Sequence, residues 1–198
     1  MNTDSEAANE ITGYLFKTNA IEVCDPKEPF FYTSGKLGPY YINTHYLYGT
    51  AADADSLLNV MAEAADMHRE LPSLLKDRIM EQYNSNDVFR HVIDILCKET
   101  SALRFDLISG GERRDFFFSI PVAVLTDTPH LSIFKDGKVF YSTKGFRETL
   151  SVDEFSISGA KSLHIADLVT EASSYVRAWI PALKRLEAEI CCSVAVVD

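Results

Sequence analysis

The stretch GAKSLHIADLVTEASSYVRAWI, residues 159–180, has the order of a short apolar strand, one acid, a turn, and a helix that opens on two serines. Proteins of the α/β class bind phosphate groups at such a turn, because the N–H groups of the first helical turn point at the anion. This turn contains Glu171 and no glycine, and a carboxylate beside a phosphate costs on the order of 1–4 kcal/mol. The stretch therefore predicts either a phosphate site or a strand–turn–helix unit that only packs, with Ser173 capping the helix.

From residue 104 onward, apolar strands alternate with helices. Strands are expected at 104–109, 130–134, 162–167 and 190–197, the last of them buried. Helical patterns lie between or before them at 115–127 and 173–188. Alternation of this kind is typical of a parallel sheet wrapped by helices. We therefore predict an α/β fold with a parallel sheet flanked by helices.

The first part of the chain has a different pattern. An amphipathic helix is expected at 4–19. Aromatic-rich strands at 30–33 and 40–43 are joined by SGKLGP, which predicts a hairpin. Three helices are expected between about 53 and 101, where apolar residues recur at helical spacing.

Composition excludes several classes of function. The chain has 198 residues, 46% of them hydrophobic, and a formal net charge of −10. That length fits one domain with a substantial core. The acidic surface would repel a polyanion and the sequence has no basic run, so we expect no nucleic-acid partner.

The four cysteines do not form a CxxC pair, and we expect buried free thiols in a reducing compartment. The acidic N-terminus has no long apolar run, and no stretch reaches the ~20 apolar residues of a membrane span. We therefore expect a cytoplasmic protein without a membrane partner.

Other catalytic chemistry lacks sequence support. The five histidines show no metal-ligand spacing, and HExxH, GxSxG and P-loop motifs are absent. His164 lies on an apolar strand and is interpreted as a core histidine. We expect no metal site built from protein side chains.

Three segments together resemble the orotate phosphoribosyltransferases, members of the type I phosphoribosyltransferase family. They are SGKLGPYYIN at 34–43, FDLISGGERR at 105–114 and SLHIADLVTEASS at 162–174, and they occur in the family's order. The chain resembles a divergent member. The resemblance implies a type I phosphoribosyltransferase-like fold, with a small hood built from the N-terminal region.

The same resemblance implies a division of one integrated domain into three parts. Residues 1–49 would be the N-terminal helix and hood hairpin, 50–103 a helical insertion, and 104–198 the α/β core. The insertion is longer than the family's segment at this place. Its amphipathic helices must bury an apolar face, either in the hood or at a subunit interface.

The implied reaction moves ribose 5-phosphate from phosphoribosyl pyrophosphate (PRPP) to a nitrogen of a nucleobase, as in pyrimidine biosynthesis and related nucleotide metabolism. The resemblance also implies Mg²⁺ bound through the pyrophosphate of PRPP, and a homodimer in which a mobile loop closes over the partner's site.

The resemblance assigns the opening stretch to the PRPP loop. Thr170, Ser173 and Ser174 would bind the 5-phosphate, with Glu171 and Ala172 also in the loop. Asp167 matches the second of the family's two acids and would hold the ribose hydroxyls. Ala166 stands where the family has the first acid.

The other implied site residues come from three segments. Lys36, Tyr40 and Tyr41 would bind substrate from the hairpin, where Leu37 replaces a family lysine. Arg113 and Arg114 would bind pyrophosphate. Lys135 and Lys138 of the mobile loop would act in catalysis with Asp167, although Phe134 and Phe140 replace an arginine and a histidine of the family pattern.

Each of these segments also has a purely structural interpretation: a hairpin that covers the core, a surface arginine pair and a solvated lysine turn. Two functions therefore stay open, with a structural dimer as a weaker third. The first is an active phosphoribosyltransferase. The second is a catalytically degenerate protein of the same fold that binds a nucleotide or a partner in a regulatory role.

Overall fold

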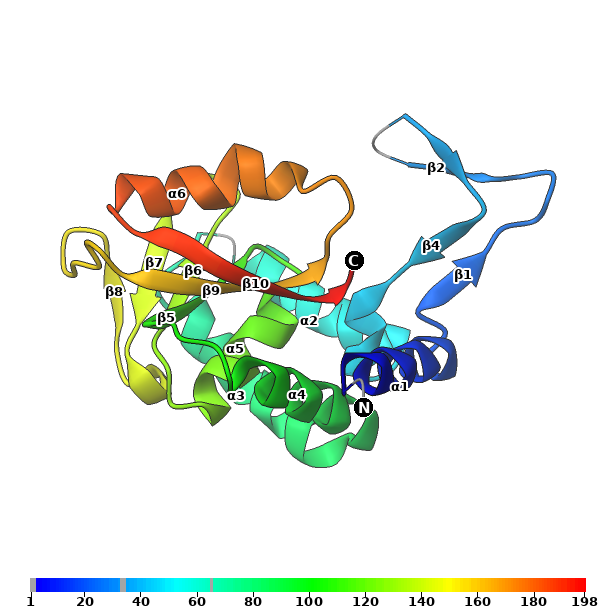
Figure 1. Cartoon of the computed structure of the whole chain (residues 1–198), viewed down its shortest axis with the longest axis horizontal. Coiled ribbons are helices and arrows are strands. Elements are labelled where there is room, and N and C mark those ends of the chain that lie inside the picture. Colours follow the sequence, from blue (N-terminus) through cyan, green and yellow to red (C-terminus); the bar gives the residue numbers. More distant parts are fainter. Residues whose placement is uncertain (1–2, 33–34, 65) are drawn as a thin grey trace.

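A six-stranded sheet forms the centre of the structure, a computed structural model that describes residues 3–32, 35–64 and 66–198 (Figure 1). The strand order is β10-β9-β5-β6-β7-β8. The four parallel strands are β5 (Leu107–Gly111), β6 (His130–Ile133), β9 (Lys161–Leu168) and β10 (Glu189–Val197). Two antiparallel strands, β7 (Val139–Ser142) and β8 (Thr149–Ser151), complete one edge. The predicted α/β class with a mostly parallel sheet is confirmed.

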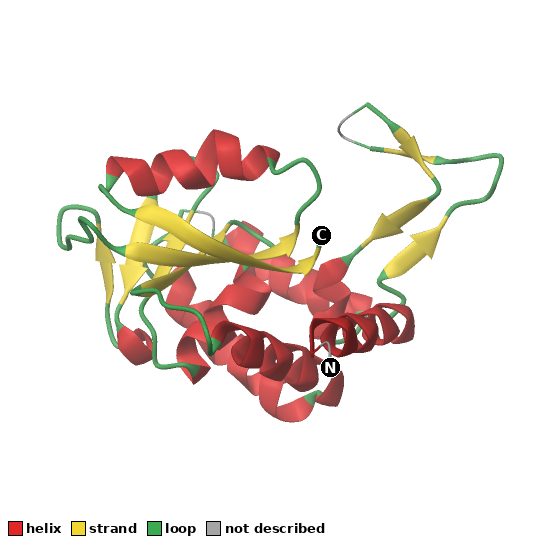
Figure 2. Ribbon diagram, in the orientation of Figure 1, coloured by secondary structure: helices red, strands yellow, loops and turns green. Residues whose placement is uncertain are grey.

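Helices cover both faces of this sheet (Figure 2). A π-helical turn (Tyr175–Trp179) and α6 (Ile180–Arg185) lie on one face, and α5 (Phe116–Leu125) lies on the other. Side chains of β5 alternate between the two layers, since Leu107 packs with Trp179 and Leu183 while Ile108 packs with the α5 side. Both faces of the central strands are therefore buried, as a parallel sheet requires.

The helical segment before β5 shares the core of the sheet. It comprises a 3₁₀ helix (Thr44–Tyr48), α2 (Ala51–Glu63), α3 (Leu71–Ser85) and α4 (Asp87–Thr100), so the three predicted helices are confirmed. Asn86 caps α4 by accepting a hydrogen bond from the N–H of Phe89. Buried apolar residues of α2, α3 and α4 belong to the same cluster as those of α5, β5 and β9. The division at residues 49 and 103 stays a prediction.

None of the helices within the described ranges is long and apolar enough to cross a bilayer.

The N-terminal part consists of α1 (Thr3–Lys17) and short strands that project from the body in Figure 1: β1 (Ile21–Val23), β2 (Phe30–Phe31), β3 (Leu37–Gly38) and β4 (Tyr40–Ile42). The predicted pairing of 30–33 with 40–43 is wrong, because β2 pairs with β3 and β4 pairs with β1. The chain already turns back at Lys36, whose carbonyl accepts from the N–H of Tyr32. Residues 33 and 34 of the predicted hairpin lie outside the described residues.

Two burial predictions are wrong. Strand β10 has one neighbour, β9, and therefore forms a sheet edge with most of its residues partly or fully exposed. The cysteines are free, but Cys191 is exposed and Cys24, Cys97 and Cys192 are only half-buried.

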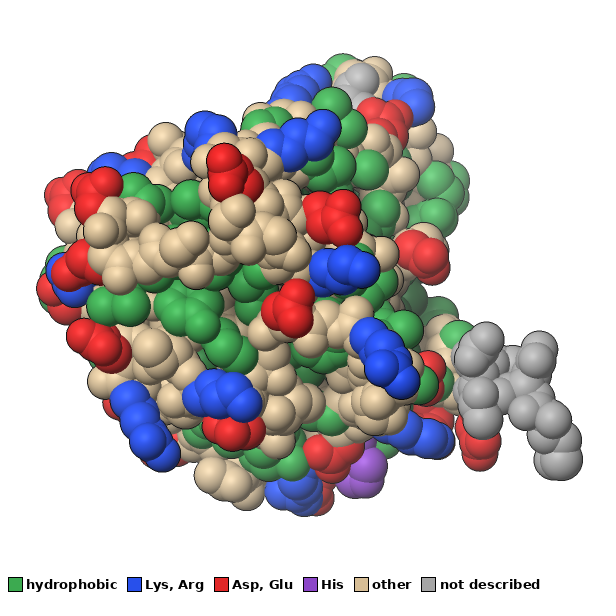
Figure 3. Space-filling view, turned by 60° about the vertical axis from the view of Figure 1, so that its left-hand side comes forward, with side chains coloured by type: hydrophobic (Ala, Val, Ile, Leu, Met, Phe, Trp, Pro, Cys, Tyr) green, Lys and Arg blue, Asp and Glu red, His purple; other side chains and the backbone are tan. Residues whose placement is uncertain are grey.

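Acidic and basic side chains are interspersed on the face seen in Figure 3.

Phe117 of α5 should be a main determinant of stability. Its ring is fully buried and meets the ring of Tyr48 edge-on, with 5.2 Å between centroids. We expect Phe117→Ala to lower the free energy of unfolding by about 3–5 kcal/mol, because the lost burial leaves a cavity. In Phe16→Ala, the matched control at a 61% exposed ring, the change should stay within about 0.5 kcal/mol. Urea unfolding measures both, and equal midpoints would refute the assignment.

Candidate functional site

A cavity of about 380 Å³ lies at the carboxyl ends of β5 and β9. Ligands of α/β proteins bind at this edge of the sheet. The cavity is lined by the loop after β5, by the end of β9 with the loop and π-helical turn that follow, and by single residues of β4, α2 and the turn between β6 and β7. The loop after β5 contains a cis peptide bond between Glu112 and Arg113.

The structure brings most of the predicted site residues into this one cavity. Those that line it are Tyr41, Arg113, Arg114, Lys135, Asp167, Thr170, Ala172, Ser173 and Ser174. They come from four separate segments of the chain, so the grouping is a property of the tertiary structure.

Four predicted site residues lie outside the cavity lining: Lys36, Tyr40, Lys138 and Glu171. Tyr40 is half exposed on the hairpin. Lys138 forms an ion pair with Asp136 at 3.0 Å. It lines a different cavity, together with Arg185, the last residue of α6. The turn between β6 and β7 therefore presents Lys135 to the site and points Lys138 away from it.

Glu171 points out of the cavity toward the hairpin. Its Oε1 accepts a hydrogen bond from Nζ of Lys36 at 2.7 Å, and both side chains are exposed. This hydrogen bond raises the pKa of Lys36 and lowers the pKa of Glu171. The carboxylate that counted against a phosphate site is thus turned away and neutralised by a residue far away in the sequence.

The loop after β9 presents hydrogen-bond donors. The N–H groups of residues 170–172 have no backbone acceptor within the described part of the chain. Ala172 has a φ of +49°, the left-handed region that usually requires glycine. The hydroxyl-bearing Thr170, Ser173 and Ser174 line the cavity where the next helix begins. The loop therefore has the donors that an anion needs without a glycine in it.

Asp167 is the acid at the end of β9. Its Oδ2 accepts a hydrogen bond from the hydroxyl of Thr44 at 2.6 Å, and its backbone N–H donates to Oδ1 of Asp115 at 3.0 Å. Burial, and next the negative charge of Asp115, raise the pKa of Asp167 to about 7. At neutral pH this carboxyl group can thus either carry or release a proton.

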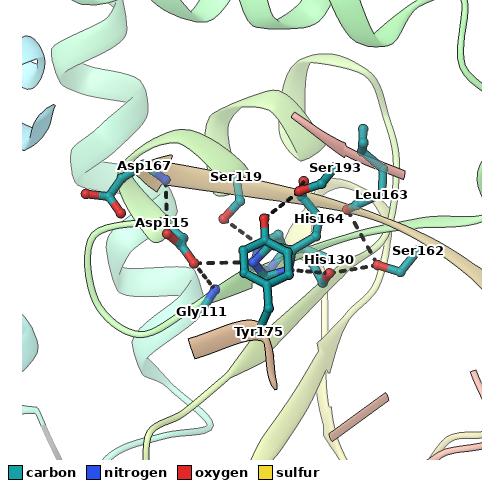
Figure 4. A network of polar contacts seen from close by, with 11 residues as sticks. Gly111, Asp115, Ser119, His130, Ser162, Leu163, His164, Asp167, Tyr175 and Ser193 are labelled. Carbon is teal, nitrogen blue, oxygen red and sulfur yellow. Dashed lines mark hydrogen bonds and ion pairs between the residues drawn. The ribbon is translucent and has the colours of Figure 1, made fainter. Parts of the chain in front are cut away.

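Asp115 and His164 form a buried polar network behind the cavity (Figure 4). Oδ2 of Asp115 accepts from the N–H of Gly111 at 2.9 Å and lies 3.4 Å from Nε2 of His164. Nδ1 of His164 lies 2.9 Å from the hydroxyl of Ser109, which accepts from Ser162 at 2.7 Å. The interpretation of His164 as a core histidine is confirmed for its burial, which is complete, but among the described residues its Nε2 has no hydrogen-bond partner.

Sequence reasoning missed Asp115 and Thr44 as parts of the site. Asp115 directly follows the two arginines and precedes an apolar helix, which was the available signal. It gives α5 no side-chain cap and bonds the two loops instead. For Thr44 the sequence offers no signal, because its partner Asp167 is 123 residues away.

The cavity contains basic side chains although the chain as a whole is acidic. Arg113, Arg114 and Lys135 line it together with acids of the two loops. Two neighbouring guanidinium groups are suited to phosphate oxygens, which they can bind in pairs. Burial, and next the charge of Arg114, lower the pKa of His45 to about 4, so the nearby histidine stays neutral.

Asp167→Asn should stabilise the fold in a pH-dependent manner. The native state holds a proton on Asp167 up to about pH 7, whereas the unfolded chain releases it near pH 4. Wild-type stability therefore falls as pH rises between these values. We expect the gain from Asp167→Asn to grow by about 1–3 kcal/mol from about pH 5 to about pH 8. Thermal unfolding at both pH values measures this, and a gain that is the same at both would contradict the raised pKa.

The chain matches no protein-family profile. Its similar curated proteins include adenine phosphoribosyltransferases. That of Thermosipho africanus is 29% identical over 46% of this chain and 49% of the relative. That of Caldicellulosiruptor saccharolyticus is 33% identical over 44% and 45%, and that of Campylobacter hominis is 28% identical over 61% and 70%. The chain thus spans about half the length of the first two relatives.

Solved structures of low sequence identity share the fold. The UMP synthase of Leishmania donovani has a TM-score of 0.59 at 15% identity, covering 98% of this chain and 31% of that one. The orotate phosphoribosyltransferase of Aeropyrum pernix has a TM-score of 0.58 at 13% identity, covering 93% and 79%. The sequence matches and the fold together support a relationship to the type I phosphoribosyltransferases.

Proposed function

We propose that the cavity binds PRPP and that the protein transfers its ribose 5-phosphate to a nucleobase, releasing pyrophosphate. One observation carries this proposal: the same cavity is lined by Arg113 and Arg114 and by a loop with three hydroxyl side chains, whose N–H groups at 170–172 have no backbone acceptor among the described residues. A substrate with a phosphate at one end and a pyrophosphate at the other fits that arrangement. The similar curated proteins are enzymes, which favours an active transferase over a regulatory binding protein.

Each part of PRPP has a proposed set of partners. The 5-phosphate would bind the N–H groups of residues 170–172, with hydroxyls from the same loop adding bonds. The ribose hydroxyls would bind Asp167. The pyrophosphate would bind Arg113, Arg114 and Lys135, whose charges stabilise the leaving group as its bond to the ribose breaks.

The new bond forms between the anomeric carbon of the ribose and a nitrogen of the base. The protein's task is mainly to align the two reactants and to stabilise the departing charge, since no covalent enzyme intermediate is needed. Tyr41 is the aromatic residue of the hairpin that lines the cavity. Its ring face suits a planar heterocycle, so we place the base against it.

Two bases are candidates. Orotate follows from the resemblance of segments 34–43, 105–114 and 162–174 taken together, and adenine follows from the names of the similar curated proteins. Magnesium would enter on the oxygens of the pyrophosphate and neutralise part of its charge. Within the described residues, no group of three or more His, Cys, Asp or Glu side chains could hold an ion.

A homodimer is part of the proposal. The projecting hairpins carry exposed apolar side chains, with Val23 and Phe31 each 75% exposed and Leu37 62% exposed. A second copy of the chain would remove this surface from water.

Calorimetric titration with PRPP and MgCl₂ tests the proposal directly. We expect binding, and release of pyrophosphate when orotate or adenine is added, with the productive base identifying the substrate. Arg114→Gln should weaken PRPP binding by about 10- to 100-fold, because a charge-assisted hydrogen bond contributes roughly 1.5–3 kcal/mol. Arg90→Gln, which changes an arginine on α4 paired with Asp87, is the control and should bind normally. Light scattering of the same sample reports the oligomeric state. No heat at millimolar PRPP would refute the proposal.

The ion pair between Lys36 and Glu171 should favour PRPP binding, because Lys36 neutralises the carboxylate of the phosphate loop. Lys36→Ala leaves an unneutralised carboxylate next to the loop, so PRPP affinity should fall several-fold, and more at low salt than at high salt. In Glu171→Ala the affinity should be unchanged or higher, because the freed lysine adds positive charge.

The double variant Lys36→Ala/Glu171→Ala tests whether Lys36 acts by neutralising Glu171 or only through its own positive charge. If the lysine acts by neutralising Glu171, the double variant should bind PRPP more tightly than Lys36→Ala alone. Equal affinity of these two variants would show that the pair does not work in this way.

A further inference from the structure

Asp115 lies in the loop after β5, and its carboxylate is bonded to the ends of two strands. Oδ1 accepts from the N–H of Asp167, next to the last residue of β9, and Oδ2 accepts from the N–H of Gly111, the last residue of β5. The two bonds measure 3.0 and 2.9 Å. Asp115 is only 7% exposed, so water competes little for these bonds. This side chain thus connects the loop after β5 to the end of β9, directly before the phosphate loop.

His164 lies beside that side chain inside the sheet, with its Nε2 3.4 Å from Oδ2 of Asp115 and without a hydrogen bond to it. The hydroxyl of Ser162 donates to Ser109, so the single hydroxyl proton of Ser109 is available for Nδ1 of His164. A neutral ring then has its N–H at Nε2, the nitrogen that lies 3.4 Å from Asp115. The rings of Tyr175 and Trp179 pack against His164, with centroids 4.8 and 6.2 Å away. The imidazole is therefore fixed in the orientation that faces the carboxylate (Figure 4).

The turn at Gly111 has little room to move. A Cβ atom at Gly111 would lie 2.1 Å from the Trp179 ring, and one at Gly110 would lie 2.1 Å from the hydroxyl of Ser119. The backbone of Gly110 and Gly111 is thus closely packed on both sides. Because the N–H of Gly111 is bonded to Asp115, the carboxylate has a fixed position relative to the start of the loop that carries the two arginines. At Ala166, beside Asp167, the side chain has no polar atom. Within the described residues, Asp115 is the acid whose charge acts on the pKa of Asp167.

We propose that Asp115 is a positioning residue for PRPP, which holds the phosphate loop and the pyrophosphate turn at the distance that one PRPP molecule spans. The imidazole of His164 packs beside its carboxylate at 3.4 Å. This inference rests on the proposed function and adds to it the residue that directly follows the two arginines of the pyrophosphate turn.

Asp115 should also affect the pH dependence of PRPP binding, through the pKa of Asp167. The charged and titratable groups that face Asp167 are Asp115 and Arg114, from the loop after β5, and Tyr175, from the helix after the phosphate loop. The negative charge of Asp115 contributes to the raised pKa of Asp167. Without that charge, the pKa of Asp167 falls toward its ordinary value. The pH at which PRPP affinity changes should therefore move down.

Asp115→Asn tests this inference. The amide keeps one acceptor oxygen but places an NH₂ group against one of the two N–H donors. We expect PRPP affinity to fall by about tenfold or more, the cost of a lost hydrogen bond to a charged group. The midpoint of its pH profile should shift to lower pH. Circular dichroism and thermal unfolding establish that the variant is folded.

Asp106→Asn is the matched control. Asp106 also accepts a backbone hydrogen bond, from the N–H of Lys161 at 2.8 Å, and it bridges the same two strands at their opposite ends. Its replacement should leave PRPP affinity and the pH midpoint unchanged. If Asp115→Asn does not fold, Ser109→Ala keeps Asp115 and removes the donor to His164. It should then weaken PRPP binding by a few-fold, and unchanged affinity would overturn the inference.

The outcomes separate this inference from the proposed function. A wild-type protein that does not bind PRPP would end the proposed function itself. A wild-type protein that binds, together with an Asp115→Asn variant of equal affinity and equal pH midpoint, would overturn the role of Asp115 alone. Weaker binding with an unchanged midpoint would show a purely structural role and would overturn it as well.

Discussion

Two loops at the carboxyl edge of a parallel sheet must be held against each other, and a single buried carboxylate does this. The strands β5 and β9 are hydrogen-bonded only up to Ser109 and His164, and beyond that point the two chains separate. Asp115 bridges the gap with one oxygen on Gly111, at the end of β5, and the other on Asp167, near the end of β9. The cavity between the loops therefore depends on a contact that is polar and buried, and such a contact is costly to leave unsatisfied.

The helical segment between the hairpin and β5 supports the same edge from a different direction. Its 3₁₀ helix carries Thr44, whose hydroxyl binds Asp167. The neighbouring aromatic side chain of Tyr48 packs on Phe117 of α5 and on Phe89 of α4. The segment between the hairpin and β5 thus contributes a hydrogen bond to the site as well as apolar surface to the core.

Local charge, rather than net charge, decides what the cavity can bind. The chain has a formal net charge of −10, yet Arg113, Arg114 and Lys135 line the cavity. The one acid of the phosphate loop that does not line the cavity is paired with Lys36 from the hairpin. The hairpin therefore contributes to the site electrostatically, in addition to bringing Tyr41 to the cavity wall.

The sequence by itself determined the features that depend on neighbouring residues. Alternating apolar strands and helices predicted the α/β class, and helical spacing predicted three helices before β5. The order of strand, acid, turn and helix at 159–180 located the candidate phosphate loop. Sequence alone misplaced the hairpin pairing, because β4 has its partner in β1 and not in the nearer β2.

Only the tertiary structure decided how the segments meet. Lys36 and Glu171 are 135 residues apart, and the N–H of Asp167 is 52 residues from Asp115. The strand order that brings such residues together is set by the packing of the whole core. Periodicity and motif spacing describe only short stretches, so they identify the groups that could bind a phosphate but not the partners that orient and neutralise them.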